Sequence, residues 1–282
     1  MPVSDQEITT LASTHDIITI GMRADEARRH LHGAATTFVR VADVAADQGP
    51  IAVAAAAGEI RIDGFPASLS AGVDRVAAVV SQAHGIPVSA FALSDLEQLA
   101  VRENATLRFI LEELRAAGLE LVAEAPFDRL QDARRSIEEV NIAGLALARL
   151  TIHQLTSEDV PALLRRVVNL QRAVAVIRAF APLPRRPNPA TPTTGFDDVK
   201  RIALARLIVE NVPSIQVDWA LYGPKLAQVA LTVGADDVDS VSPEDDTGEG
   251  RRRAPLEEIR RNIRAAGLEA VERNGRFDVV AQ

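Results

Sequence analysis

The sequence predicts an α/β protein built on a parallel (β/α)₈ barrel of the TIM type, and three observations carry this prediction. Eight β-like segments follow one another from residue 36 onward, with an amphipathic helical stripe in most of the gaps. Aromatic residues make up only 4% of the chain, so the core must be aliphatic, which favours close packing of helices on a sheet. The length of 282 residues suits one barrel with added helices. A doubly wound open sheet is the alternative.

The N-terminal segment, residues 5–33, is polar and helical in character. It predicts two short helices, with cap oxygens between them from Ser13, Thr14 and Asp16. We expect a single domain over residues 1–282, with residues 1–35 forming a helical leader and residues 242–282 a C-terminal extension.

The strands and helices of the barrel follow in order. The predicted strands are 36–42, 59–63, 86–92, 119–124, 145–152, 174–180, 214–219 and 237–241. Apolar stripes at a spacing of three or four residues predict helices that include 69–80, 107–114 and 160–167. The helix that ends at Gly118 leads directly into a buried strand, because glycine is the usual residue after a helix C-terminus.

Three connections are unusual. Segment 44–58 is too short for a loop and a full helix, so the first βα unit is expected to be incomplete. Segment 182–197 contains five of the 15 prolines and is expected to be extended and irregular. Segment 242–255 changes from acidic to glycine-rich to basic, and the arginine run 251–253 within it predicts a solvated surface loop.

Composition excludes several classes of function. The 31 basic and 39 acidic residues give a net charge of −8, which argues against general nucleic-acid binding. No segment approaches the roughly 18 to 20 apolar residues of a membrane helix, and the first residues lack the order of a signal peptide, so we expect a cytoplasmic protein. The absence of cysteine excludes disulfides, thiolate zinc sites, a cysteine nucleophile and thiolate-held iron–sulfur clusters.

Several segments carry a family resemblance. The longest are KRIALARLIVENVPSIQVDW (200–219), AQVALTVGADDVDSV (227–241) and the leader DQEITTLASTHDIITIGMRADEARRHLHG (5–33). Shorter ones are IRIDGFP (60–66), SAFALSDL (89–96) and EELRAAGL (112–119). Together they resemble the radical SAM enzymes of the futalosine route to menaquinone, which are aminofutalosine synthase and cyclic dehypoxanthine futalosine synthase. The resemblance spans nearly the whole chain and implies a (β/α)₈ barrel with helical additions at each end.

The resemblance also implies a [4Fe–4S] cluster, held by three cysteines after the first strand, that reduces S-adenosylmethionine. The chain departs from the family at this position, which is VADVAADQGP (41–50) and offers no thiolate. It departs again at VAEAPFDRL (122–130), and at TIHQLTS (151–157), where a histidine is kept and an acid is lost. We therefore expect no cofactor, and the resemblance gives little support for binding of S-adenosylmethionine.

Functional groups of such barrels lie at the C-terminal ends of the strands. Trp219 is expected to stack on a base, Asp63 or Asp95 to accept hydrogen bonds from ribose, and Arg178 to pair with a carboxylate. His153 and Asp218 are the candidate catalytic residues. The full expected strand-end set is Asp43, Asp63 with Gly64, Asp95, Glu124, His153, Arg178, Asp218 with Trp219, Asp237 and Asp239.

Structural and chemical alternatives stay open. Trp219 and His153 are also compatible with packing roles, and Gly64 with a purely conformational one. Asp63, Glu124, His153 and Asp218 together would suit a divalent cation, although hydrolytic metal barrels usually supply several histidines; we predict no metal site.

Two hypotheses of function follow. The first is a cluster-free member of the futalosine-pathway family that binds a small nucleoside- or carboxylate-bearing ligand, or serves as partner to an intact radical SAM homologue. The second is an enzyme that uses acid–base or metal-assisted chemistry in the retained barrel pocket.

Overall fold

The computed structural model of the chain describes residues 5–47, 49, 51, 53–155, 159–190, 192–244 and 255–280. The arginine run 251–253 and most of segment 242–255 lie outside the described residues, and so do Thr156 and Ser157 of the segment 151–157.

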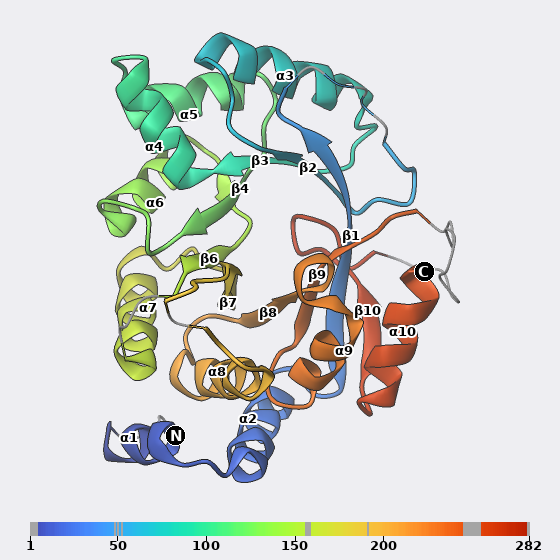
Figure 1. Ribbon diagram of the computed structural model, residues 1–282. Helices are drawn as coiled ribbons and strands as arrows, with labels where there is room; N and C mark the ends of the chain where they lie inside the picture. Colours follow the sequence, from blue (N-terminus) through green and yellow to red (C-terminus); the bar gives the residue numbers. More distant parts are fainter. Residues whose placement is uncertain are drawn as a thin grey trace.

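Eight parallel strands form a closed barrel, because the last of them pairs back onto the first. This confirms the predicted fold class (Figure 1). A two-residue strand, β5 (Ala146–Leu147), pairs with β4, and an additional strand, β10 (Glu269–Glu272), pairs with β1 outside the ring. The ring consists of β1 (Ala35–Ala45), β2 (Glu59–Asp63), β3 (Val88–Ala92), β4 (Leu121–Pro126), β6 (Leu150–Gln154), β7 (Ala179–Arg186), β8 (Ser214–Asp218) and β9 (Asp237–Val241).

Helices cover the outside of the ring and extend it at both ends of the chain (Figure 1). The barrel helices are α3 (Leu69–Gln82), α4 (Leu93–Arg102), α5 (Leu107–Ala116), α6 (Ala133–Ile142), α7 (Val160–Val174), α8 (Gly195–Ile208) and α9 (Trp219–Leu231). The leader forms α1 (Asp5–Ser13) and α2 (Ile17–His32), as the sequence predicts, and α10 (Pro255–Ala265) precedes β10. The Asp16 side chain caps α2 by accepting a hydrogen bond from the Thr19 backbone N–H.

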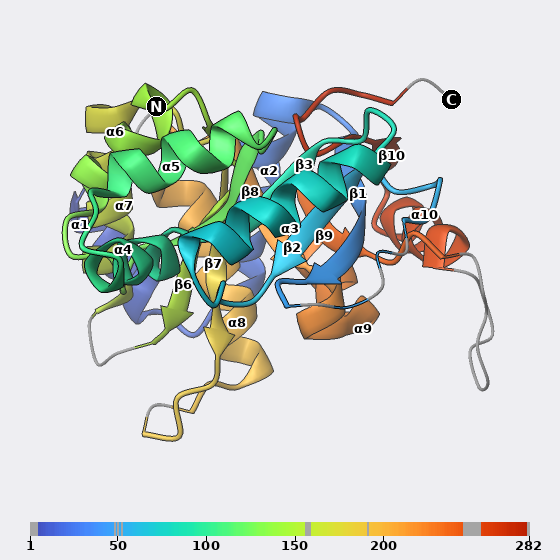
Figure 2. The ribbon, with the colours of Figure 1, turned by 90° about the horizontal axis from the view of Figure 1, so that it is seen from above.

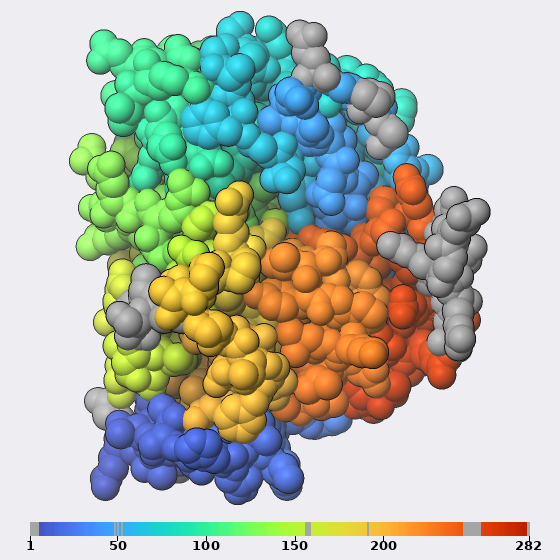
Figure 3. All heavy atoms as spheres, viewed as in Figure 1, coloured from blue at the N-terminus to red at the C-terminus, as the bar shows by residue number. Residues whose placement is uncertain are grey.

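The leader packs against the rest of the chain. Helix α2 packs against α8, and the leader lies along the lower edge of the space-filling view (Figure 3). Lys200 of α8 donates hydrogen bonds to the carbonyl oxygens of Ala12 and Thr14, at 2.6 and 2.7 Å. The turn between α1 and α2 is therefore attached to the barrel through its own backbone.

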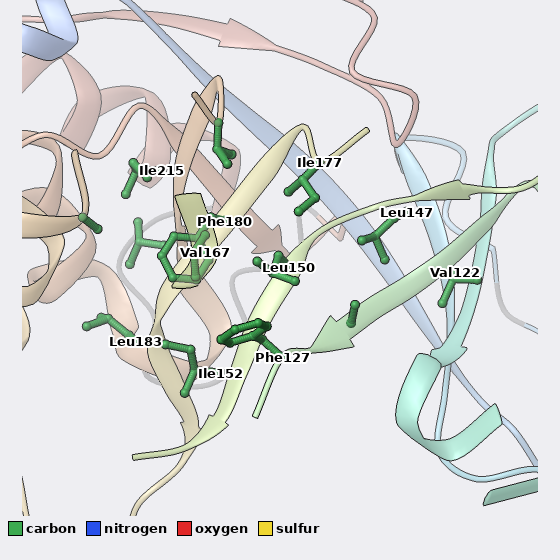
Figure 4. Close-up of a cluster of buried hydrophobic side chains, with 14 of the residues drawn as sticks. Val122, Phe127, Leu147, Leu150, Ile152, Val167, Ile177, Phe180, Leu183 and Ile215 are labelled. Atoms are coloured by element: carbon green, nitrogen blue, oxygen red, sulfur yellow. The ribbon is translucent and has the colours of Figure 1, made fainter. Parts of the chain in front are cut away.

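The core between helices and strands is aliphatic, as the composition predicts. Figure 4 shows Val167 of α7 beside Leu150, Ile152 and Phe180 of strands β6 and β7. All four side chains are fully buried. Burial of such side chains stabilises the fold by roughly 1.5 to 3 kcal/mol each before entropy is counted.

The sixth strand of the ring, β7, lies later than predicted. The expected strand 174–180 is wrong because α7 continues to Val174 and closes with Ala175 in the left-handed conformation. Strand β7 then runs through the part of the proline-rich segment that was expected to be irregular. The prolines Pro182 and Pro184 are tolerated because the β6–β7 register shifts beside them and β8 pairs only with Ala179 and Phe180.

The first βα unit is incomplete, as the sequence predicts. Strand β1 is followed by β2 with no helix among the described residues between them. Arg75 of α3 holds the connection by donating hydrogen bonds to the carbonyl oxygens of Ala45 and Gly49, at 2.9 and 3.0 Å. The Ala46 N–H also donates to the carbonyl oxygen of Asp63, which ties the end of β1 to the end of β2.

In the part of the chain that the structure describes, no helix combines the length and the apolar character needed to cross a membrane.

Candidate ligand-binding site at the barrel mouth

A cavity of about 650 Å³ lies at the C-terminal ends of the strands, which we call the barrel mouth. Figure 2 shows the arrows of β1, β6 and β7 pointing to this same side, with the connection between β7 and α8 extending beyond them. Each of the eight ring strands contributes at least one residue to the cavity lining. A charged cavity at this end of a barrel is where a ligand site is expected.

The cavity brings together most of the predicted site residues. Those that line it are Asp43, Asp63, Gly64, Asp95, Glu124, His153 and Asp218. Their shared location confirms that these positions follow strand ends on one side of the barrel; their roles in ligand binding stay predictions.

Arg178 does not line the cavity, and its expected position at the barrel mouth is wrong. Because β7 begins at Ala179, Arg178 lies at the opposite end of the strand. Its guanidinium donates to the carbonyl oxygen of Arg276, at 2.6 Å. The carboxylate-pairing role predicted for Arg178 therefore has no support from its position.

Trp219 is also absent from the cavity lining. It is the first residue of α9 and belongs to the hydrophobic core, with 9% of its surface exposed. The alternative of a packing role describes this position better than base stacking. Asp218 precedes it and caps α9 by accepting a hydrogen bond from the Leu221 N–H.

Five arginines line the cavity and were missed in the sequence. They are Arg61, Arg129, Arg149, Arg185 and Arg186. Arg61 lies within a predicted strand, and Arg185 and Arg186 lie in the segment that was expected to be irregular.

Buried ion pairs form the floor of the cavity. Arg61 contacts Glu59 and Asp239, at 2.9 and 3.0 Å. Arg149 contacts the other oxygen of Asp239, at 2.8 Å. The side chains of these four residues are at most 6% exposed, so water screens their charges little.

A second set of ion pairs links the floor to β8. Arg185 lies 3.1 Å from Glu124 and 2.5 Å from Asp218. Ser240 completes the network by donating to Asp218 and accepting from Arg61. In this network the Nε of Arg149 and Oε2 of Glu124 are buried without a hydrogen-bond partner, although they lie 4.0 Å apart.

The pKa values of the floor residues reflect this geometry. Burial raises the pKa of Asp239, but the charges of Arg149 and Arg61 outweigh burial and hold it well below its usual range. Burial and the nearby charge of Arg61 lower the pKa of Arg149. The negative charge of Asp239 only partly offsets this lowering. Asp239 is therefore a carboxylate at all ordinary pH values, while the cation of Arg149 is incompletely compensated.

The rim around β6 carries cationic groups. Arg129, His153 and Arg186 line it, and none of these three side chains makes a hydrogen bond or ion pair with another described residue. Asp128 fixes the local backbone by accepting hydrogen bonds from the N–H groups of His153 and Gln154. Burial and the positive charge of Arg129 lower the pKa of His153, so its imidazole is neutral at pH 7.

Carboxyl groups line the other side of the cavity. Asp43 and Asp63, at the ends of β1 and β2, have no side-chain hydrogen bond or ion pair with a described residue. Burial raises the pKa of Asp43 against the opposing charge of Arg61, and the neighbouring carboxylates Asp239 and Asp63 add to this rise. Burial also raises the pKa of Asp95, against the opposing charge of Arg129.

Two lining residues have strained backbones. Phe91 at the end of β3 and Ser240 in β9 both adopt a φ of +58°, a conformation that residues other than glycine rarely take. Each costs on the order of 1 kcal/mol or more, and such residues cluster at functional sites. Their presence in the lining of one cavity supports its assignment as the candidate site.

The segment after β1 does not fit a thiolate-held cluster. The positions there are Val44, which is buried, followed by Ala45, Ala46 and Asp47. A Cβ on Gly64 would lie 3.3 Å from the Cβ of Ala46, so this segment packs directly against the end of β2. Among the described residues, no group of three or more His, Cys, Asp or Glu side chains could hold a metal ion. The divalent-cation alternative thus has no geometric support.

Comparison with known proteins places the chain in a family context. Residues 184–282 match the family model for the CofH/MqnC C-terminal region. The chain is 36% identical over 96 residues to aminodeoxyfutalosine synthase from Streptomyces coelicolor, which is 32% of this chain and 24% of that protein. It is 25% identical over 225 residues to cyclic dehypoxanthine futalosine synthase from the same organism, covering 71% and 56%. The matches thus span from a quarter to just over half of these relatives' lengths.

Solved structures agree on the fold. The chain superposes on methylornithine synthase (PylB) with a TM-score of 0.69 at 14% sequence identity, covering 96% of this chain and 94% of the other. At this identity the likeness concerns the fold alone. The C-terminal third of the chain, residues 184–282, is therefore similar to the CofH/MqnC C-terminal region, and longer stretches of the chain are similar to the two futalosine synthases.

Proposed function

We propose that this chain is a cluster-free relative of the futalosine-pathway enzymes that binds a small carboxylate-bearing or nucleoside-like metabolite at the barrel mouth. The observation that carries the proposal is the 650 Å³ cavity, lined by unpaired charged groups and strained residues, in a chain without a thiol. A cavity of this size suits a metabolite, since ligand pockets are typically about 300 to 1,000 Å³. The names of the relatives, which are futalosine synthases, support a nucleoside-like ligand.

The arginines explain how a carboxylate would be held. Arg149 is buried, lines the cavity and has an unpartnered Nε–H, which would donate a charge-assisted hydrogen bond to a ligand oxygen. Leaving such a buried donor without a partner costs about 1 to 3 kcal/mol. A ligand carboxylate at this point would recover part of that free energy.

The claim that the chain holds no cluster is tested by anaerobic reconstitution with iron and sulfide, followed by assays of both elements and an absorption spectrum. We expect no stoichiometric cluster and no reductive cleavage of S-adenosylmethionine. A stable [4Fe–4S] cluster at one per chain would overturn this claim.

The claim that the barrel mouth binds a metabolite is tested by calorimetric titration with benzoate, benzamide and adenosine. We expect binding of benzoate or adenosine and a weaker or undetectable response to benzamide. Arg186→Gln, a substitution at an accessible cavity residue, should weaken benzoate binding. The absence of binding by both benzoate and adenosine would contradict the proposal.

A second candidate function is acid–base catalysis, and the state of His153 favours it. A neutral imidazole that lines a cavity, has a lowered pKa and lacks a side-chain partner is suited to accept a proton. Asp218 is a poorer candidate, because its oxygens are engaged by the Leu221 N–H and Arg185. Once a turnover is found, His153→Gln should abolish it without changing thermal stability; retained turnover would exclude this role.

Partnership with an intact homologue remains the third proposal. Ile18 and Met22, one turn apart on α2, are 72% and 68% exposed, which would suit a protein contact. Co-purification with an intact family member tests it, with Ile18→Ser and Met22→Ser as the variants expected to weaken the complex.

A further inference from the structure

The unpaired carboxyl groups of the cavity lie on one side of the barrel. Asp43 belongs to β1 and Asp63 ends β2, and these strands are adjacent. Burial raises the pKa of Asp43; the charge of Arg61 opposes this rise without cancelling it, and the neighbouring carboxylates Asp239 and Asp63 add to it. A cation entering the cavity would be attracted to this wall.

The cationic groups that can still donate to a ligand lie on the other side. Arg149, which directly precedes β6, pairs with Asp239 but keeps an unpartnered Nε, and the unpaired Arg186 ends β7. In the ring order β1-β2-β3-β4-β6-β7-β8-β9, β6 is four strands from β1 and β7 is four strands from β2. Strands β1 and β2 therefore lie across the ring from β6 and β7 (Figure 1), and the acidic and cationic walls that they carry face each other.

Each wall also contains residues whose charge is opposite to that of the wall, and these residues are already paired within the protein. Arg61, on the acidic side, is paired with Glu59 and Asp239. Glu124 and Asp218, beside the cationic wall, are both paired with Arg185. The groups left for a ligand are consequently carboxylates at β1 and β2, the unpartnered Nε–H of Arg149 before β6, and Arg186 at the end of β7.

We infer that the ligand of this cavity is a zwitterion with separated charges, whose ammonium group binds at Asp43 and Asp63 and whose carboxylate binds at Arg149 and Arg186. The inference rests on the proposed function and adds to it the cationic end of the ligand and its orientation. Because the two walls belong to opposite strands, the charges of the ligand must be separated by a spacer rather than carried on one carbon atom. The strained Phe91, on β3 between the two walls, lines the space that the spacer would cross.

A series of ω-amino acids measures the separation of the walls. Glycine, 4-aminobutanoate and 6-aminohexanoate are titrated into the protein, with hexanoate and hexylamine as single-charge controls. We expect one chain length to bind about tenfold more tightly than glycine and about fivefold more tightly than the matched single-charge compounds. Equal affinity of 6-aminohexanoate, 4-aminobutanoate and hexanoate would overturn the inference.

Two variants test which wall binds the ammonium group of the ligand and which wall binds its carboxylate. Asp43→Asn with Asp63→Asn should weaken binding of the best zwitterion about fivefold and leave hexanoate binding unchanged. Arg186→Gln should weaken both compounds. Unchanged zwitterion affinity in the double variant, with a thermal midpoint equal to that of the parent, would exclude the acidic wall as the ammonium site.

The outcomes separate this inference from the proposal on which it rests. If benzoate and hexanoate bind, and an added amino group does not increase the affinity, the proposed function stands and the zwitterion inference is wrong. No binding of benzoate, adenosine or any amino acid would overturn both.

Discussion

His153 shows how neighbouring side chains set the chemistry of a single residue. It is the histidine of the cavity lining, and burial together with the positive charges of Arg129 and Arg186 lowers the pKa of its imidazole. The folded chain therefore favours the neutral form more strongly than the unfolded chain does. A folded-state pKa below the unfolded value means that protonation of His153 lowers stability as the pH falls through this range.

We predict that proton NMR of the imidazole will give His153 a pKa below the ordinary histidine value of about 6.5. Arg186→Gln should raise this pKa, because one of the repelling charges is removed. His153→Gln assigns the resonance among the five histidines of the chain. A pKa at or above the ordinary value in the parent would show that the rim is not cationic.

Gly234 is a position where both conformation and space require glycine. Its φ is +111°, and an added Cβ would lie 2.8 Å from the Cβ of Arg206 and 3.1 Å from that of Ala24. The backbone of Gly234 also accepts a hydrogen bond from Arg206 at 2.9 Å, so the two segments cannot separate freely.

We predict that Gly234→Ala lowers the free energy of unfolding by about 2 to 4 kcal/mol, from backbone strain plus overpacking. Gly195→Ala is the matched control, because Gly195 lies at the start of α8 with no atom within 4 Å of an added Cβ. The control should be neutral or stabilising by up to about 1 kcal/mol. Urea denaturation measures both, and equal stability of the two variants would contradict the crowding at Gly234.

At the residue scale, the sequence located the acids and His153 of the cavity but not its arginines. Acids that directly follow apolar strands are visible in the sequence, because a strand end fixes which side of the barrel they face. Arg61 and Arg149 are not visible in this way, since an arginine in a strand normally predicts an accessible position. Their burial depends on Asp239, which is distant in the sequence and adjacent only in the closed barrel.

The element β10 and the segment after it attach the C-terminal region to the barrel. Arg273 follows β10 and pairs with Asp237 of β9, at 2.6 Å, with both side chains almost fully buried. Its guanidinium also lies 3.9 Å from the ring centre of Phe277. Three residues later, Arg276 pairs with Glu120 near the surface, at 2.6 Å.

We predict that Arg273→Ala lowers the free energy of unfolding by about 3 to 5 kcal/mol, because it leaves the carboxylate of Asp237 buried without its cation. Arg276→Ala removes an arginine from the same segment, but its pair is 41% and 34% exposed, so the loss should stay below about 1 kcal/mol. Denaturant midpoints of the two variants test this contrast. A larger loss for Arg276→Ala would mean that the surface pair fixes the segment.

At the element scale, most strands and helices could be predicted because their periodicity is strong. The strand 59–63 agrees in both bounds with β2, and 237–241 with β9. Strand β7, the sixth of the ring, could not be predicted, because its prolines normally exclude a central strand. Only the register shift against β6 and the short pairing with β8 allow prolines there.

At the scale of the whole molecule, the barrel interior contains a network of buried charges that links strands from every side. Asp239 is its most connected acid, since it pairs with Arg61 and Arg149. Its pKa lies well below the unfolded value of about 3.9. Asp239 therefore adds stability at pH values above the unfolded pKa, and this contribution is lost as the pH falls below that value.

We predict that Asp239→Asn makes the free energy of unfolding less dependent on pH between about pH 5 and pH 2. The raised pKa values of Asp43, Asp95 and Asp236 act in the opposite direction and are retained in the variant, so the difference reports on Asp239. Asp74→Asn, at an exposed position of α3, should keep the parental slope. Urea titrations across this range provide the measurement, and identical slopes for all three proteins would refute the prediction.

The sequence by itself determined the barrel, its incomplete first βα unit, the family resemblance and the lack of thiolates, because these depend on local periodicity, chain length and residue type. Only the tertiary structure decided which charges remain free at the barrel mouth. Closing the ring brings β9 beside β1 and places β6 across from β1, so the pairing of each arginine depends on acids many residues away. Charge pairing in the closed barrel is a long-range property, and residue spacing along the chain does not encode it.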